Sequence, residues 1–130
     1  MQHYRKKCYI FESPKKWRLI ETYYRPTVVL TKSNGFVTGS ARSVAGFDLY
    51  QAVESCSDLL ENFGGHMYAA GLTMKEENVA AFTKRFNDYV EKNINPQILV
   101  PQVDIDSELL FSEITDEFHR QLNSFQPFGP

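Results

Sequence analysis

Residues 27–43 have the sequence TVVLTKSNGFVTGSARS, and this stretch decides the fold. Residues 27–31 are rich in β-branched side chains, which favour a buried strand. An Asn-Gly pair follows at positions 34–35, and both residue types accept the positive φ of a tight hairpin turn. Residues 36–38 then return as the partner strand. The stretch therefore predicts a hairpin that delivers residues 39–43 as a loop at its end.

The segments on either side of this hairpin predict further elements. Before it, we expect a strand at residues 6–11 and a short helix at 17–24, which Pro26 ends. After it, apolar residues recur at helical spacing over residues 48–62, and Asp48 is a favourable N-cap for that helix.

The C-terminal half predicts one more buried strand and two more helices. Residues 69–74 are typical of a short buried strand, and residues 75–94 of an amphipathic helix. Partial alternation over residues 103–111 predicts a half-buried strand with its apolar residues facing inward. A last helix is expected over residues 113–125. The order of elements predicts an α/β (α+β) fold, a mixed β-sheet with flanking helices.

Composition limits the classes of function. The 130 residues are 42% hydrophobic and 14% aromatic, enough for one folded core. A free-standing nucleic-acid-binding protein is usually basic, so the net charge of -2 gives that class no support. Cys8 and Cys56 lack the spacing of a zinc site or disulfide framework, which favours a reducing, cytoplasmic setting. No apolar run is long enough to span a bilayer.

Residues 39–43 combine the donors that an anion needs. Arg42 can bind two phosphate oxygens at once, and Ser40 and Ser43 add hydroxyl groups. Gly39 lets the backbone come close to a ligand. The alternative is an ordinary polar loop whose serines cap a helix.

The Gly64-Gly65-His66 segment is the second candidate. Gly64 alone is typical of a helix C-cap, but Gly65 and an immediate His66 are harder to explain by capping. His66 is a candidate to donate to a phosphate oxygen, to act as an acid or to bind a metal. Metal binding is the least favoured of the three, because His3 and His119 lie far away in sequence. A buried structural histidine is the alternative.

The two segments are expected to form one site. The predicted helix over residues 48–62 separates them, and its two ends bring Arg42 and His66 to a shared glycine-lined hollow sized for an oxyanion. The acidic residues predict no metal site, since Asp104 and Asp106 alternate with apolar residues as on a solvated strand face.

These residues resemble a known family, the DHH-associated domain of the RecJ exonucleases. Those enzymes are single-strand-specific 5′→3′ DNA exonucleases of the DHH phosphoesterase superfamily. The resemblance extends over residues 19–130, and residues 103–108 and 127–130 are similar to the part that leads toward an OB-fold domain. The segments that carry it most clearly are 25–30, 39–43, 48–49, 63–66 and 69–71.

The resemblance implies a division of the chain. Residues 19–95 would be the DHH-associated substrate-binding domain, and residues 96–130 a strand–helix extension leading toward an OB-fold domain. Residues 1–18 match poorly, and Trp17 lacks the histidine that follows the corresponding tryptophan in the family. The family holds its manganese or magnesium in a preceding DHH domain, and this chain has no Asp-His-His motif. We therefore expect a fragment that binds no metal and is inactive alone.

The resemblance also implies a function, the holding of single-stranded DNA for a 5′→3′ exonuclease of DNA repair and recombination. His66 would approach the scissile phosphate as an auxiliary catalytic residue. The implied partners are single-stranded DNA, bound weakly by this chain alone, and the DHH and OB-fold domains of the same polypeptide, with no membrane. The residues implied in substrate binding are Gly39, Ser40, Arg42, Ser43, Gly64 and Gly65.

Two other functions stay open. One is a phosphoesterase of the same superfamily for short oligonucleotides or cyclic dinucleotides. Such relatives commonly end near the Gly-Gly-His segment, so residues 103–130 favour the exonuclease. The other is a non-enzymatic anion-binding or interaction module that has kept the fold.

Overall fold

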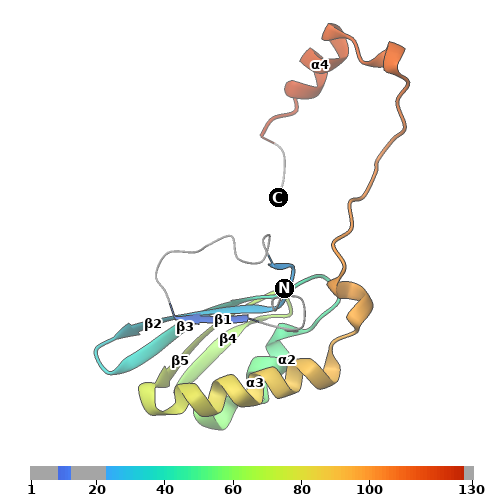
Figure 1. Cartoon of the computed structure of the whole chain (residues 1–130). Helices are drawn as coiled ribbons and strands as arrows, with labels where there is room; N and C mark the ends of the chain where they lie inside the picture. The colour runs from blue at the N-terminus through green and yellow to red at the C-terminus, as the bar shows by residue number, and fades with distance from the viewer. Residues whose placement is uncertain (1–8, 13–22, 128–130) are drawn as a thin grey trace.

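The computed structural model describes residues 9–12 and 23–127 (Figure 1). Most of the predicted helix at residues 17–24 lies outside the described residues, as does Cys8. Five strands form one sheet in the order β1-β2-β3-β5-β4. β1 is parallel to β2 and the other neighbours are antiparallel, so the predicted mixed sheet is confirmed. The strands are β1 (Tyr9–Glu12), β2 (Thr27–Ser33), β3 (Phe36–Arg42), β4 (Asn62–His66) and β5 (Ala69–Lys75).

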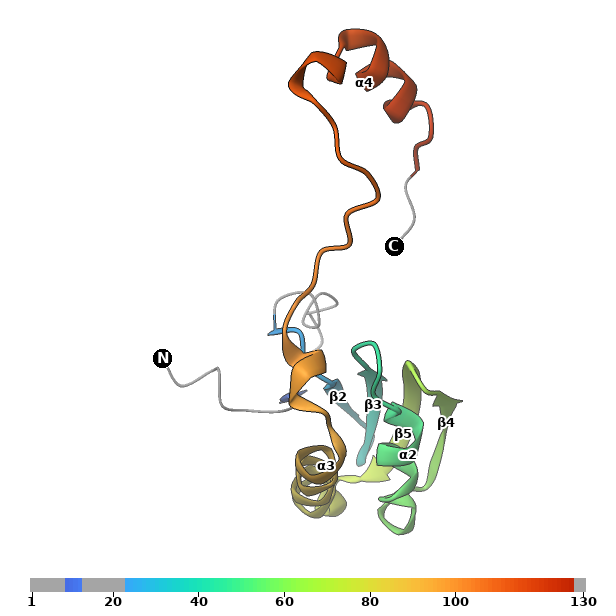
Figure 2. The ribbon, with the colours of Figure 1, turned by 90° about the vertical axis from the view of Figure 1, so that its right-hand side faces the viewer.

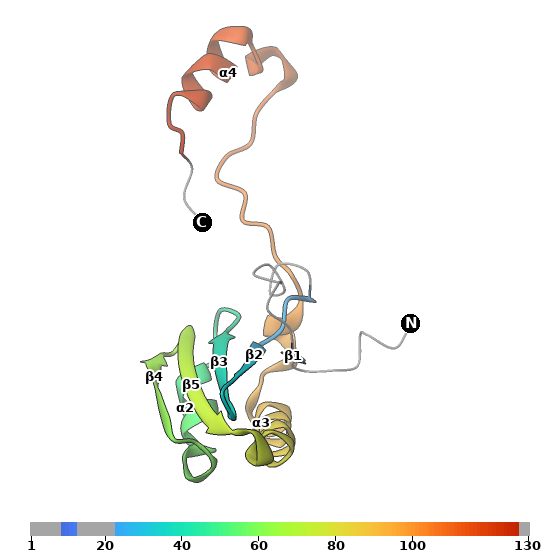
Figure 3. The same cartoon turned by 90° about the vertical axis from the view of Figure 1, so that its left-hand side faces the viewer.

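Helices cover one face of this sheet. Figures 2 and 3 show α2 and α3 on the same side, while the C-terminal segment that carries α4 extends away from the domain. In the part of the chain that the structure describes, no helix is long and apolar enough to cross a membrane. The helices are α2 (Leu49–Glu54), α3 (Val79–Asn93) and α4 (Asp116–Asn123), with short 3-10 turns η2 (Ser57–Leu59), η3 (Glu76–Asn78), η4 (Pro96–Leu99) and η5 (Phe111–Glu113).

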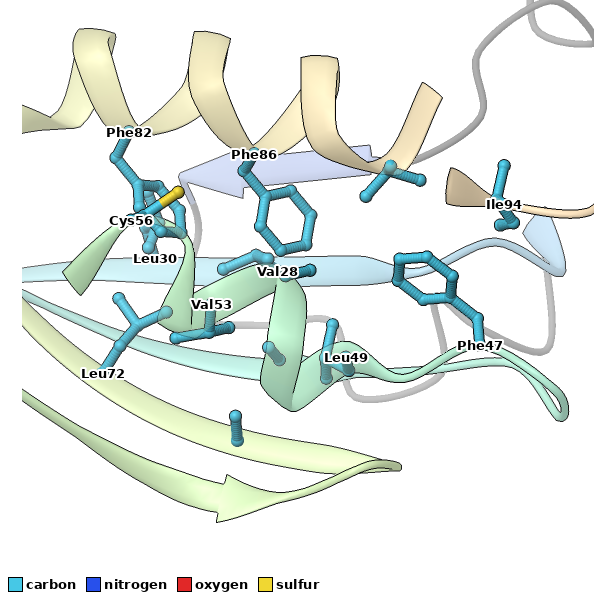
Figure 4. Close-up of a cluster of buried hydrophobic side chains, with 14 of the residues drawn as sticks. Val28, Leu30, Phe47, Leu49, Val53, Cys56, Leu72, Phe82, Phe86 and Ile94 are labelled. Carbon is cyan, nitrogen blue, oxygen red and sulfur yellow. The ribbon is translucent and has the colours of Figure 1, made fainter. Parts of the chain in front are cut away.

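The core lies between the sheet and these two helices (Figure 4). Alternate residues of a strand point to one face, whereas residues four apart lie on one side of a helix. Phe82, Phe86 and Val90 of α3 follow the helical spacing and are fully buried, and the first two rings stack 5.6 Å apart. Their buried partners are Val28, Leu30, Val37, Ala41, Ala70, Leu72 and Met74 from the strands, and Leu49, Ala52 and Val53 from α2.

The β2–β3 hairpin forms as predicted. Asn34 and Gly35 have φ angles of 52° and 80°, which are the left-handed values that this turn requires. The predicted loop at residues 39–43 is wrong, however. Residues 39–42 are the last four of β3 and pair with β2 on one side and β5 on the other. Hydrogen bonding to two neighbours outweighs the low strand preference of glycine and serine.

The predicted helix over residues 48–62 begins correctly and ends too late. Asp48 Oδ1 accepts a hydrogen bond from the Gln51 backbone N–H at 3.2 Å, so this residue is the N-cap. The helix ends at Glu54, and the chain is extended again as β4 from Asn62. Gly64 is therefore not a helix stop but a strand residue, because the edge of β5 provides β4 with a hydrogen-bonding partner.

The predicted strand over residues 103–111 is also wrong. These residues have no regular secondary structure before η5, and the side chains of Val103 and Ile105 are 88% and 83% exposed. No neighbouring strand lies beside them in the described part of the chain, so their alternation has no sheet to face. The strand–helix extension expected at residues 96–130 is thus an extended segment followed by the confirmed helix α4.

Cys56 lies in the core, as its position on the apolar side of the helical pattern predicts. Its side chain is fully buried and forms no disulfide bond. Burial raises the pKa of the thiol above its ordinary value of 9.0, since a thiolate is poorly solvated among apolar groups. The thiol is therefore protonated and unreactive at neutral pH.

This raised pKa predicts a loss of stability in alkaline solution. The unfolded chain releases the thiol proton near pH 9, whereas the folded chain retains it, so ionisation favours unfolding. The free energy of unfolding should fall as the pH rises through the raised value. Urea unfolding of the natural chain and of Cys56→Ala over a pH series measures the effect. The same alkaline loss in both proteins would contradict the assignment.

Candidate functional site

The sheet has a second face, turned away from α2 and α3, which we call the outer face. Residues directly opposite each other in an antiparallel pair point to the same side of the sheet. Because Ala41 and Ala70 are buried against the helices, their strand neighbours Arg42 and Ala69 point to the outer face. The strand register therefore decides which of the predicted site residues share this face.

One row across the sheet brings together Arg42 and His66. Arg42 of β3 lies opposite Ala69 of β5, which in turn lies opposite His66 of β4. Neighbouring strands are about 4.8 Å apart, so the two backbones are separated by about 10 Å. Only the methyl group of Ala69 stands between the two long side chains. Arg42 and His66 therefore lie on one face of the sheet.

The next row also consists of small residues. Together with Ala69, its glycines Gly64 and Gly71 form a surface without long side chains, which we call the floor of the site. Ser40 lies opposite Gly71, and Gly71 lies opposite Gly64. Both glycines are exposed, and a Cβ atom added at Gly64 would meet nothing within 4 Å. Small residues in both rows leave space above β5 and β4, flanked by one arginine, one serine and one histidine.

Arg42 carries a positive charge that no acidic side chain of the described residues neutralises. Its Nη1 donates to Ser40 Oγ at 3.2 Å and to the Ala41 carbonyl oxygen at 2.9 Å, and both acceptors are uncharged. Lys75 on the same face lies 3.9 Å from the Glu61 carboxylate. The two hydrogen bonds hold the guanidinium along β3 beside Ser40, and neither of them neutralises its charge.

His66 is exposed, which rules out the alternative of a buried structural histidine. Its Nδ1 accepts a hydrogen bond from the Tyr68 backbone N–H at 3.3 Å. Since Nδ1 is the acceptor, the neutral ring carries its proton on Nε2. The neutral ring thus keeps its Nε2–H group as a donor.

The β4–β5 turn that carries this geometry is fixed from two sides. The Leu49 N–H at the start of α2 donates to the Met67 carbonyl at 3.0 Å. The Ser43 N–H donates to the Tyr68 carbonyl at 2.9 Å. Ser43, directly after β3, and Leu49, at the start of α2, therefore hold the turn that follows His66 against the rest of the domain.

Two other residues predicted for the site, Ser43 and Gly39, make contacts within the fold. Ser43 Oγ donates to the carbonyl oxygens of Phe47 at 2.7 Å and Val44 at 3.1 Å, which orders the loop before α2. A Cβ atom on Gly39 would lie 2.7 Å from a Leu72 methyl group in the core. Gly39 and Ser43 thus shape the scaffold around the outer face, and their role in binding stays a prediction.

Gly65 is required by the backbone itself. Its φ is 150°, and a Cβ atom there would come within 2.2 Å of the Ala69 carbonyl oxygen. Its side position faces the helices, because it lies opposite the buried Ala70. Of the predicted set, the structure therefore places Ser40, Arg42, Gly64 and His66 together on the outer face.

Sequence reasoning passed over Tyr68. Its ring lies 6.2 Å from the His66 ring in an edge-on arrangement with an interplanar angle of 71°. The signal was present in the sequence as a large aromatic residue inside a short turn between a glycine pair and two alanines.

The sequence matches a known protein family. The model of the DHHA1 domain family matches residues 17–92, which is more than half of the chain. The chain belongs to the DHHA1 domain family. The DHHA1 match confirms the resemblance drawn from the residues, and it includes β2 to β5, the strands that build the outer face.

Several RecJ proteins have a similar sequence. The single-stranded-DNA-specific exonuclease RecJ of Bacillus subtilis (strain 168) is 35% identical over 114 residues, which are 86% of this chain and 14% of that protein. The RecJ of Escherichia coli (strain K12) is 32% identical over 117 residues, 86% of this chain and 20% of that protein. The DHHA1 chain thus spans between 14% and 20% of these relatives.

Solved structures of RecJ share the fold. The crystal structure of RecJ from Thermus thermophilus in complex with Mg²⁺ has a TM-score of 0.75 and 27% identity, covering 95% of this chain and 20% of that one. A RecJ structure bound to manganese has a TM-score of 0.61 and 28% identity, covering 71% of this chain and 25% of that one.

The DHHA1 residues described here do not fit such a metal. Among residues 9–12 and 23–127, no group of three or more histidine, cysteine, aspartate or glutamate side chains could hold an ion. Asp104 and Asp106 are exposed on the extended segment. The outer face instead presents the guanidinium, hydroxyl and imidazole groups of Arg42, Ser40 and His66.

Proposed function

We propose that this chain holds single-stranded DNA for a 5′→3′ exonuclease whose metal centre lies elsewhere in the polypeptide. The observation that carries the proposal is the row in which Arg42 and His66 flank a floor of alanine and glycine. The RecJ relatives support the choice of substrate, since they are single-stranded-DNA-specific exonucleases.

The geometry suits a phosphodiester group. The Arg42 guanidinium binds two phosphate oxygens through parallel N–H groups, and the Ser40 hydroxyl that now accepts from it stays within reach of the same group. The His66 Nε2–H donates from the other side of the floor. The exposed backbone at Gly64 lets the sugar–phosphate chain lie close to the sheet.

In this proposal the outer face positions the phosphate and neutralises its charge. His66 is the auxiliary catalytic residue nearest the scissile bond. Manganese or magnesium would be held by a DHH domain, and an OB-fold domain would follow, so this chain alone binds DNA weakly and does not cleave it. A role in DNA repair and recombination, in a reducing cytoplasm, belongs to the same proposal.

A titration followed by NMR tests the proposed site in the 130-residue chain. Inorganic phosphate and a short oligothymidylate should both shift the His66 ring signals, because both place an anion beside Nε2. High salt should reverse the shifts, since binding depends on phosphate charge. His119 of α4 is the matched control, an exposed histidine outside the sheet whose signals should not move.

The chain has three histidines, and the His66→Gln and His119→Gln variants assign the ring signals of these two. If neither phosphate nor DNA moved the His66 signals, the proposed site would be wrong, and an interaction module would be favoured instead.

A further inference from the structure

One side chain beside the proposed site has no explanation in the fold. Tyr68 is the second residue of the β4–β5 turn, and its side chain is 49% exposed. Its hydroxyl group has no hydrogen-bond partner among the residues that the structure describes. Beyond its edge-on contact with His66, much of the ring is exposed to solvent.

The backbone under this ring is held firmly. The Tyr68 N–H donates to His66 Nδ1 at 3.3 Å, and the Tyr68 carbonyl accepts from the Ser43 N–H at 2.9 Å. The preceding carbonyl, that of Met67, accepts from the Leu49 N–H at 3.0 Å. The ring thus projects from a turn whose backbone is held by three hydrogen bonds, and it lies beside His66.

The contact with His66 leaves an aromatic face open. The two rings meet edge-on, at 71° and 6.2 Å, so neither covers the other. A nucleobase is flat and stacks on tyrosine without regard to its identity, which suits a site that accepts any sequence. We infer that Tyr68 stacks on a base of the DNA strand whose phosphate lies between Arg42 and His66. This inference rests on the proposed function.

Phe36 provides a matched control on the same face. It is 43% exposed and points to the outer face, because the next residue, Val37, is buried in the core. It lies six residues from Arg42 along β3, which is about 20 Å in an extended strand. A base next to the phosphate at Arg42 is out of its reach.

The test compares the affinity of the full chain for a short oligothymidylate and for the same strand with abasic residues. Tyr68→Ala should weaken binding of the normal strand by about tenfold, within the range measured for base–aromatic stacking. Tyr68→Phe should retain affinity, and Phe36→Ala should resemble the natural chain. With the abasic strand, Tyr68→Ala and the natural chain should bind alike.

The abasic strand separates stacking from an indirect effect. Tyr68→Ala keeps the backbone N–H that orients His66, and a loss through His66 would persist without bases. Unchanged affinity of Tyr68→Ala for the normal strand, an equal loss with the abasic strand, or no detectable DNA binding would each overturn the inference. Failure of the proposed phosphate site is distinct, since it would appear as unchanged affinity and salt dependence in Arg42→Ala.

Discussion

Arg42→Ala should reduce the rate of single-stranded DNA cleavage by about two to three powers of ten in the proposed full-length exonuclease. The guanidinium has no acidic partner among the described residues, and its two hydrogen bonds go to neutral acceptors. Its removal would leave the reacting phosphate without its main positive contact on the outer face. Single-turnover cleavage of a 5′-labelled strand measures the effect.

Two further substitutions sharpen this test. Arg42→Lys keeps the charge but loses the paired N–H groups, so it should recover only part of the rate. Arg85→Ala is the matched control, because it removes an arginine from α3, on the opposite side of the sheet, where it pairs with Asp58. All variants should unfold near the temperature of the natural protein. A near-unchanged rate in Arg42→Ala, or an equal loss in Arg85→Ala, would refute the assignment.

Local signals were sufficient to predict the elements whose causes are local. The Asn34–Gly35 turn and the β-branched run before it predicted the hairpin, since both act over a few residues. Asp48 predicted the start of α2 because an N-cap needs only the next turn of the helix. The apolar stripe of α3 was equally clear in the sequence.

Pairing between distant strands was not predictable in the same way. The residues Asn-Phe-Gly-Gly-His of β4 contain no β-branched side chain, and they form a strand because β5 pairs with them. The spacing of Leu59, Leu60 and Phe63 imitates a longer helix, although the three side chains reach the core from η2, the following loop and β4. Sequence alone could not distinguish these two routes to burial.

The candidate site was likewise predictable from the sequence only in its local features. The residue types Ser40, Arg42 and His66 predicted anion chemistry, because their side chains have that chemistry in any fold. Their meeting on the outer face depends on a register that joins three strands, and a shift of one residue would send Arg42 into the core. Gly64 and Gly65 are both predicted to bind substrate, whereas the strand register places them on opposite faces of the sheet.

Gly65→Ala should destabilise the folded chain by about 3 kcal/mol, because a side chain there requires a rare backbone conformation and a displaced neighbour. The φ of 150° is nearly exclusive to glycine, and the added Cβ would lie 2.2 Å from the Ala69 carbonyl oxygen. Relief requires β4 to separate from β5, which also displaces His66. Thermal unfolding should show a Tm lower by about 15 °C.

Gly64→Ala is the matched control and should behave in the opposite way. The added methyl group meets nothing within 4 Å, and an alanine loses less entropy on folding than a glycine does. Stability should therefore be unchanged or slightly higher, while DNA affinity falls several-fold because the methyl group stands on the floor between Ser40 and His66. Equal destabilisation by both substitutions would show that the β4 register is wrong. An undiminished affinity in Gly64→Ala would instead mean that the strand does not approach this part of the sheet.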